Sequence, residues 1–312
     1  MWKSVFILLC TILFFGCDQQ HADRSFDAKV FRPAFTADHP RVLFDQGHNN
    51  MHRMDGTYRP FVDLISNDGC SVASIDKPFT QELLQPYDIL VIANPKGKEK
   101  KYESAFTEEE CSAVEQWVRG GGNLLLIADH HPIGSATEIL SKHFGVAMSR
   151  GFTNDSVYFD STSFTESQID GKSQLIFSRA NGLIADHPIT AGRDSTERIN
   201  KIISFTGQSL SGAGIPFLIL SSHAADVIPD SIWETKGFLD TDTHTRFAEP
   251  VSAAGKAQGI ALEFGKGRVV VMGEAAMLTA QQFKEEKFGM QQPGLDNKQL
   301  VLNIVRWLGR AL

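Results

Sequence analysis

This chain has few cysteines, no large excess of one sign of charge and few long apolar runs. Only 4 of its 312 residues are cysteine, too few for the disulfide framework of a small secreted scaffold. Lys and Arg (30) are outnumbered by Asp and Glu (37), which gives a formal net charge of −7. Because nucleic-acid binding relies on basic patches, no nucleic-acid partner is expected. The hydrophobic content of 42% is that of an ordinary globular protein.

Several catalytic signatures are missing as well. Gly259 lies one residue too far from Gly265-Lys266 for a phosphate-binding P-loop, and Gly267 stands where Ser or Thr is required. The segment from Gly207 to Ser211 lacks the second glycine of a serine nucleophile elbow. The H-E-x-x-H pattern of zinc proteases does not occur. These absences argue against P-loop, serine-elbow and H-E-x-x-H chemistry.

The first 16 residues have the pattern of a secretion signal. Lys3 supplies the positive charge, and residues 5–15 form an almost unbroken apolar run. Such a run is too short to span a bilayer, which needs about 20 residues. The following Gly16-Cys17, with polar residues after it, resembles the lipobox of bacterial lipoproteins, although Phe14 stands where Leu is usual. In that family the cysteine becomes lipid-modified and N-terminal.

The lipobox resemblance predicts a cell-envelope protein exported from the cytoplasm and anchored to a membrane through acyl chains on Cys17. Residues 1–16 would be removed, and residues 17–40, polar and without apolar periodicity, would form a flexible tether. An ordinary cleaved signal or an uncleaved anchor is the alternative. Cys70 and Cys111 remain in the exported part, and the sequence leaves open whether they pair.

From Arg41 onwards, short apolar strands alternate with amphipathic helices. Thr107-Glu-Glu-Glu110 has the pattern of a capping box that begins a helix, and Gly120–Gly122 ends it. Buried strands separated by helices indicate a parallel sheet covered on both faces. We therefore predict a doubly wound α/β fold with a mostly parallel sheet, similar to flavodoxin. The strands are expected at residues 41–45, 71–75, 89–93 and 123–128.

The pattern changes after Gly145. Residues 149–200 form a polar insertion rich in Ser, Thr and Asp. Residues 259–264 and 268–272 flank Gly265-Lys-Gly267 and predict a β-hairpin. A final helix is expected over 297–312. Together, residues 41–312 predict a single domain with one insertion.

Several segments of this domain together resemble the class I glutamine amidotransferase-like superfamily. They are Tyr87-Asp88-Ile-Leu-Val-Ile, the run from Val118 to Ile127, Gly267-Arg-Val-Val-Val-Met-Gly-Glu274 and the closing helix. The combination is most similar to its poorly characterised branches, which include trehalose-utilisation-like proteins and auxiliary domains of gliding-motility and intraflagellar-transport proteins. The resemblance implies the amidotransferase-like fold.

The resemblance fails at the nucleophile. True amidotransferases place a cysteine on a sharp turn after a central strand, where this chain has Asp129. Without a thiolate at that turn, glutamine hydrolysis through a thioester is not available. The sequence therefore predicts that the protein is not a glutamine amidotransferase.

Polar side chains follow the predicted strands, where ligands bind in open parallel sheets. Asp, His and Glu from separate strands suit either acid–base catalysis or a divalent metal ion, and equally the stabilisation of their own loops. The cofactor is therefore unknown, with a divalent metal as one option. The candidate catalytic residues are His48, Asp129, His131 and Glu274; the metal candidates are His48, Asp129 and His131; the candidate ligand-binding residues are Gln46, Asn49, Asn94 and Gln281.

Two functions follow from this pattern. The first is an envelope protein that binds a small polar ligand, carbohydrate among the options, and hydrolyses it with the His/Asp/Glu cluster. The second is a non-catalytic module that binds a ligand or a protein partner. If His48, Asp129 and Glu274 converge on an open cleft, the enzyme is favoured; if they are held in satisfied hydrogen bonds, the module is favoured.

Overall fold

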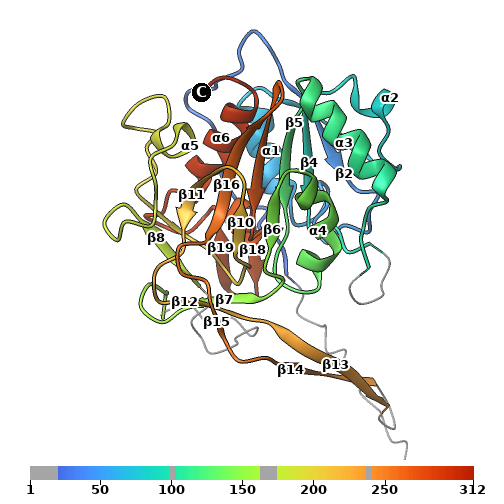
Figure 1. Cartoon of the computed structure of the whole chain (residues 1–312). Helices are drawn as coiled ribbons and strands as arrows, with labels where there is room; N and C mark the ends of the chain where they lie inside the picture. Colours follow the sequence, from blue (N-terminus) through green and yellow to red (C-terminus); the bar gives the residue numbers. More distant parts are fainter. Residues whose placement is uncertain (1–19, 98–102, 162–173, 237–240) are drawn as a thin grey trace, which may run out of the picture.

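The computed structural model describes residues 20–97, 103–161, 174–236 and 241–312. A nine-stranded sheet forms its centre (Figure 1). Eight strands follow one another across the sheet, and the ninth, β11 (Ile215–Ile219), pairs with β16. The order is β3 (Ser71–Ile75), β2 (Arg41–Asp45), β4 (Ile89–Ala93), β5 (Asn123–Ile127), β17 (Gly267–Met272), β16 (Ala257–Phe264), β10 (Leu210–Gly212) and β6 (Val146–Met148).

The sheet has a parallel half and an antiparallel half. From β3 to β17 every pairing is parallel, as the unbroken apolar strands predict. The predicted hairpin is confirmed as β16–β17, and it reverses the direction, so β16, β10, β6 and β11 join by antiparallel pairings. The structure is therefore α/β with a mixed sheet. The expectation of a mostly parallel sheet is correct only for the half before the hairpin.

Helices cover both faces of the sheet. Alternate side chains along each strand point to opposite faces, so Val42 and Phe44 join one core and Leu43 the other. The first core lies under α1 (Arg59–Asn67) and α6 (Asn297–Leu308). The second lies under α3 (Glu108–Gly120) and α4 (Ile133–His143), with the short α2 (Gln81–Leu84) beside them. This arrangement makes the sheet doubly wound.

The helix α3 begins as its sequence predicts. The hydroxyl of Thr107 accepts from the amide of Glu110, whose carboxylate accepts from the amide of Thr107. The helix ends at Gly121, whose φ of 125° suits only glycine without strain. A Cβ on Gly122 would lie 2.2 Å from the Trp117 ring, so this glycine permits the close return of the chain into β5.

Cys70 and Cys111 are both free and buried. Cys70 belongs to the core under α1 and α6, whereas Cys111 belongs to the core under α3 and α4. Because the sheet separates these cores, the two thiols do not pair in this fold.

Residues 20–40, expected as part of a flexible tether, are instead part of the domain. β1 (His21–Ala22) pairs with β18 (Ala280–Phe283), which pairs with β19 (Glu286–Gly289). Phe35 is only 5% exposed and joins the core. The polar composition misled the prediction, because scattered apolar side chains dock here without helical or strand periodicity. Residues 1–19, with the expected signal and Cys17, lie outside the described residues.

The polar insertion expected at 149–200 contains real elements, although residues 162–173 lie outside the described part. Its first strand, β7 (Phe152–Asp155), pairs with β12 (Ala224–Val227), which also pairs with β15 (Val251–Ser252). Its second strand, β8 (Ile176–Ser178), pairs with β9 (Lys201–Ile203), and α5 (Pro188–Ala191) contacts α6. The ribbon of β13 (Pro229–Lys236) and β14 (Thr241–Phe247) extends away from the body (Figure 1).

The last helix carries a buried cluster of charges. Arg306 is 1% exposed, and its guanidinium donates to both oxygens of Asp68 at 2.8 Å. The same side chain lies 3.1 Å from Glu197. Asp68 also accepts from the amide of Ala34 at 2.9 Å, so the cluster fastens residues 32–35 to the domain.

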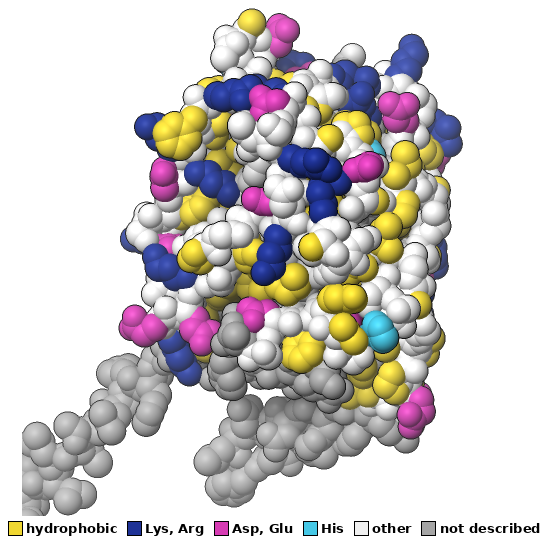
Figure 2. All heavy atoms as spheres, turned by 90° about the vertical axis from the view of Figure 1, so that its left-hand side faces the viewer, with side chains coloured by type: hydrophobic (Ala, Val, Ile, Leu, Met, Phe, Trp, Pro, Cys, Tyr) yellow, Lys and Arg dark blue, Asp and Glu magenta, His cyan; other side chains and the backbone are white. Residues whose placement is uncertain are grey.

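Charges of both signs are interspersed on the surface around α5 and β11, as Figure 2 shows. Many of them lie close enough to pair. Arg32 and Asp194 are 2.7 Å apart, and so are Arg179 and Asp186. Separately, within the described ranges no helix has the length and apolar character needed to cross a membrane.

Candidate functional site

The structure brings Asp129 and Glu274 together at the carboxyl edge of the parallel strands. Asp129 follows β5 and Glu274 follows β17, and these two strands are neighbours. Asp129 is half-buried, whereas Glu274 is 1% exposed. Asn94, at the end of β4, donates to Asp129 at 2.5 Å and accepts from its amide at 3.0 Å. Asp129, Glu274 and Asn94, all candidate site residues, therefore lie together at this edge, whereas His48, which was expected to join Asp129 and Glu274, is bonded to Asp45 and Glu110.

Both carboxylates are used to hold the loop after β17. Asp129 accepts from the amide of Ala275 at 2.7 Å. Glu274 accepts from the amides of Ala276 and Met277, each at 2.7 Å, at the start of the short helix η1 (Ala276–Leu278). The Tyr58 hydroxyl donates to the carbonyl of Ala275 at 2.7 Å. The hydrogen bonds of this cluster therefore fix the conformation of the loop at residues 274–278.

Burial makes ionisation of this pair costly. It raises the pKa of Asp129 to about 6, against the hydrogen bonds from Asn94 and Ala275. It raises the pKa of Glu274 to about 8, and the nearby charge of Asp129 adds to the rise. At neutral pH the pair therefore retains a proton, mostly on Glu274.

Because the folded protein retains this proton on Glu274, its free energy of unfolding decreases as the pH rises. Glu274 keeps its proton up to about pH 8 when folded but only to about its ordinary pKa of 4.5 when unfolded. The folded state thus binds more protons between these values, so stability decreases as pH rises towards 8 and levels off above it. Between pH 6.5 and 8.5 we expect the wild-type protein to lose about 2 kcal/mol of unfolding free energy.

The measurement is urea denaturation at several pH values in that window, on wild type and Glu274→Gln. The variant should show a flatter pH dependence, whatever its absolute stability. His48, whose pKa is also raised, contributes to the loss in both proteins. Parallel pH profiles for the two proteins would show that Glu274 titrates normally.

His48, the first catalytic and metal candidate, is hydrogen-bonded to carboxylates other than Asp129 and Glu274. Its Nδ1 lies 2.8 Å from Asp45 and its Nε2 lies 2.9 Å from Glu110 on α3. The ring also packs against Phe79 and Phe106, with centroids 4.6 and 4.7 Å away. Burial opposes the charged ring, but hydrogen bonds and charges from Asp45 and Glu110 prevail and raise the pKa of His48. Because both ring nitrogens bind carboxylates, the interpretation of His48 as a catalytic or metal-binding residue is not supported.

The two histidines after Asp129 lead into α4. His131 is 8% exposed and lies two residues before α4. The His130 ring stacks on Phe152 of β7 with centroids 4.0 Å apart, and its Nδ1 lies 2.8 Å from the carbonyl of His131. Burial lowers the pKa of His130 to about 4. These contacts join the start of α4 to the insertion.

The four candidate ligand-binding residues lie in different settings. Gln46 accepts from the amide of Met54 at 3.0 Å, and Asn49, with a φ of 53°, donates to the carbonyl of Gly97 at 3.1 Å. Asn94 binds Asp129, as described above. Gln281 on β18 is 1% exposed, and its amide group has no hydrogen-bond partner among the described residues. The first three side chains therefore shape loops.

The metal hypothesis finds no donor set in the described part of the chain. No group of three His, Cys, Asp or Glu side chains there is arranged to hold an ion. Of the three metal candidates, His48 is bonded to Asp45 and Glu110, and Asp129 to Asn94 and Ala275. Within the described ranges, these candidates therefore do not form a metal-binding set.

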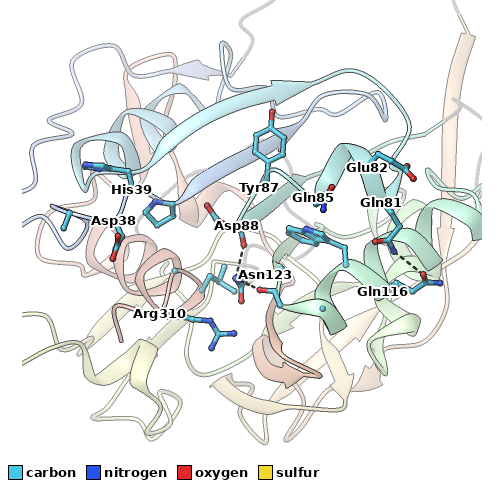
Figure 3. Close-up of a pocket in the computed structure, with 18 residues that line it drawn as sticks. Asp38, His39, Gln81, Glu82, Gln85, Tyr87, Asp88, Gln116, Asn123 and Arg310 are labelled. Carbon is cyan, nitrogen blue, oxygen red and sulfur yellow. Dashed lines mark hydrogen bonds between the residues drawn. The ribbon is translucent and has the colours of Figure 1, made fainter.

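A cavity of about 930 Å³ lies at the opposite, amino-terminal edge of the sheet (Figure 3). In Figure 3, Asp88 and Asn123 lie near its middle, with Gln81 and Gln116 on one side and Arg310 below. Gln81 donates to Gln116 at 3.2 Å, and Asn123 donates to the carbonyl of Asp88 at 2.9 Å. Neither Asp129 nor Glu274 lines this cavity.

Sequence reasoning missed this cavity because it considered only the carboxyl ends of the strands. A signal was available in Gln81, the first residue of α2, and Gln85, which directly follows the helix, because side chains four residues apart on a helical turn lie on the same side. The third amide, Gln116, lies on α3 and could be placed beside them only by the packing of the two helices.

Comparison with known proteins relates the fold, but little else, to earlier structures. No family model and no curated protein sequence matches the chain. The mmIFT52 N-terminal domain aligns with a TM-score of 0.57 at 15% identity, over 86% of this chain and 97% of that one. A ThuA-like protein from Bacteroides uniformis (TM-score 0.41, 12% identity, 89% and 93% of the two chains) and a GMP synthase-like protein from Thermoplasma acidophilum (0.38, 11%, 86% and 96%) are more distant.

At such identities the likeness defines a class of fold only. The chain is an α/β protein that shares its architecture with the mmIFT52 N-terminal domain.

Proposed function

We propose that this chain is a cell-envelope lipoprotein whose amidotransferase-like, flavodoxin-like domain binds a small polar ligand without hydrolysing it through the predicted cluster. The observation that carries the proposal is the use of His48. Its two ring nitrogens both bind buried carboxylates, which leaves neither as a base. Asp129 and Glu274 are likewise engaged with backbone amides. The module hypothesis is therefore preferred to the hydrolase.

The amino-edge cavity is the binding site we propose. It offers amide groups from Gln81, Gln85 and Gln116, together with the half-buried ring of Tyr87. Amides both donate and accept, which suits hydroxyl groups, and an aromatic ring adds an apolar face. A carbohydrate is the ligand class that matches this combination. The site departs from the general preference for carboxyl ends in open parallel sheets.

This proposal is tested by measuring, with calorimetry, the affinity of the protein for a panel of mono- and disaccharides. Gln116→Ala should weaken binding of any sugar bound by the wild type about fivefold, because one hydrogen bond contributes roughly 1 kcal/mol. The control is Asn67→Ala, an exposed amide on α1 away from the cavity. Equal affinities for Gln116→Ala and wild type would remove the cavity as the site.

The hydrolase alternative has its own outcome. If the wild type converts a bound sugar and Glu274→Gln binds it without conversion, Glu274 is catalytic and the module proposal is wrong. The anchor is tested separately by mass spectrometry of the membrane-bound protein, in which Cys17→Ser should abolish acyl modification. Persistence of the lipid in that variant would place the anchor at another residue.

A further inference from the structure

The link between the proposed lipid anchor and the folded domain is very short. Cys17 precedes Gln20 by three residues, and His21 already pairs with Gln282 of β18. The amide of Asp23 donates to the carbonyl of Ala280 at 3.0 Å, which continues the attachment. Three extended residues span at most about 11 Å. A lipid on Cys17 would therefore hold this side of the domain close to the membrane.

The surface on this side has the chemistry of a membrane contact. A cavity of about 1120 Å³ lies between residues 20–26 and residues 51–63. Met51 is 51% exposed at its edge, an unusual position for a large apolar side chain. Three arginines, Arg24, Arg53 and Arg59, also line the cavity. We call these four residues, with the segment 20–26, the anchor-side face.

The acidic groups of this face are mostly engaged. Asp23 is 5% exposed and binds Lys287 at 2.6 Å. Arg59 lies 2.6 Å from Asp63 on α1, and Arg53 lies 3.3 Å from Asp55. Side-chain exposures of 63% for Arg59 and 48% for Arg53 leave donors on both guanidiniums facing solvent. Such donors suit the phosphate oxygens of lipid headgroups.

We propose that the anchor-side face rests on an anionic lipid bilayer, with Met51 at the headgroup–acyl boundary and Arg24, Arg53 and Arg59 on lipid phosphates. This inference rests on the lipid anchor of the proposed function. A membrane contact there would orient the whole domain. The anchor-side face includes residues that come after the carboxyl end of β2, whereas the amino-edge cavity is lined by residues that come before the amino ends of β2 and β4. The amino-edge cavity then lies on the side of the domain away from the membrane.

Site-specific quenching tests this orientation on the full lipidated protein. A fluorophore is attached to Met51→Cys or, as a control at the opposite edge, to Glu82→Cys, and each protein is placed in phosphatidylcholine–phosphatidylglycerol vesicles that carry a headgroup quencher. Cys70 and Cys111 do not interfere, because burial raises the pKa of each thiol to about 12. Since interfacial side chains enter the headgroup region by about 5–10 Å, quenching at 51 should be at least about threefold stronger than at 82.

The outcomes separate the two proposals. If the protein does not float with the vesicles, the anchor is wrong and the orientation fails with it. If it floats but residue 82 is quenched as strongly as residue 51, the anchor stands and the anchor-side face is wrong. Arg24→Cys gives a second label on the same face in case Met51→Cys folds poorly. Adding Arg53→Glu and Arg59→Glu to the labelled protein should halve the ratio of quenching at residue 51 to quenching at residue 82. Lys142→Glu should leave this ratio unchanged.

Discussion

Replacing Arg306 with alanine is expected to lower the unfolding free energy by about 3–5 kcal/mol. Arg306 is buried on α6 and neutralises two carboxylates, Asp68 and Glu197, which are 0% and 5% exposed. Without the guanidinium, Asp68 stays buried beside apolar side chains without its charge partner. Losing one member of a buried ion pair costs far more than losing an exposed one.

Chemical denaturation followed by circular dichroism measures this loss. Arg119→Ala is the matched control, because Arg119 is exposed on α3 and pairs with Glu115 on the same helix. It should cost less than about 1 kcal/mol. Hydrogen exchange should also show faster exchange at residues 32–35, which Asp68 and Arg306 hold through backbone groups. A loss of under about 1 kcal/mol for Arg306→Ala would mean that the cluster is solvated.

Replacing His48 with alanine is expected to destabilise the fold by about 2–4 kcal/mol, while leaving ligand affinity unchanged. The variant leaves Asp45, which is 0% exposed, and Glu110 of α3 without the ring between them. It also opens a space beside the rings of Phe79 and Phe106. The loop after β2 would then lose its attachment to α3.

Thermal and urea unfolding give the size of this effect, with the exposed His223→Ala as the control. A double-mutant cycle with Glu110→Ala isolates the contact, and we expect a coupling of about 1–3 kcal/mol. Additive effects would show that His48 and Glu110 do not interact. A stable His48→Ala protein that loses ligand turnover would instead restore the catalytic role that the sequence suggested.

Elements whose cause is local were predicted well. The four apolar strands of the parallel half and the hairpin at 257–272 lie close to their expected positions. The capping box of Thr107 and Glu110 begins α3 as expected, because its partners are three residues apart. The convergence of Asp129 and Asn94 also followed from topology alone, since neighbouring parallel strands end at one edge.

The features that the sequence alone left undecided depend on distant partners. His48 had the composition of a catalytic residue, and only the position of Glu110, 62 residues away, makes it part of a structural network. Residues 20–40 have no periodic pattern, yet Phe35 is buried in the core and β1 completes a three-stranded sheet with β18 and β19. The antiparallel half likewise extends through β10 and β6, which are only three residues each and give little sequence signal.

Local side-chain periodicity was thus enough to establish an α/β fold with a doubly wound parallel half, since burial on two faces imposes its pattern on every strand. The use of each polar side chain could be known only after folding. A histidine or carboxylate has the same sequence signature whether it faces a ligand or a neighbouring backbone amide. The choice between these depends on which segments the packing brings within about 3 Å, the reach of a hydrogen bond.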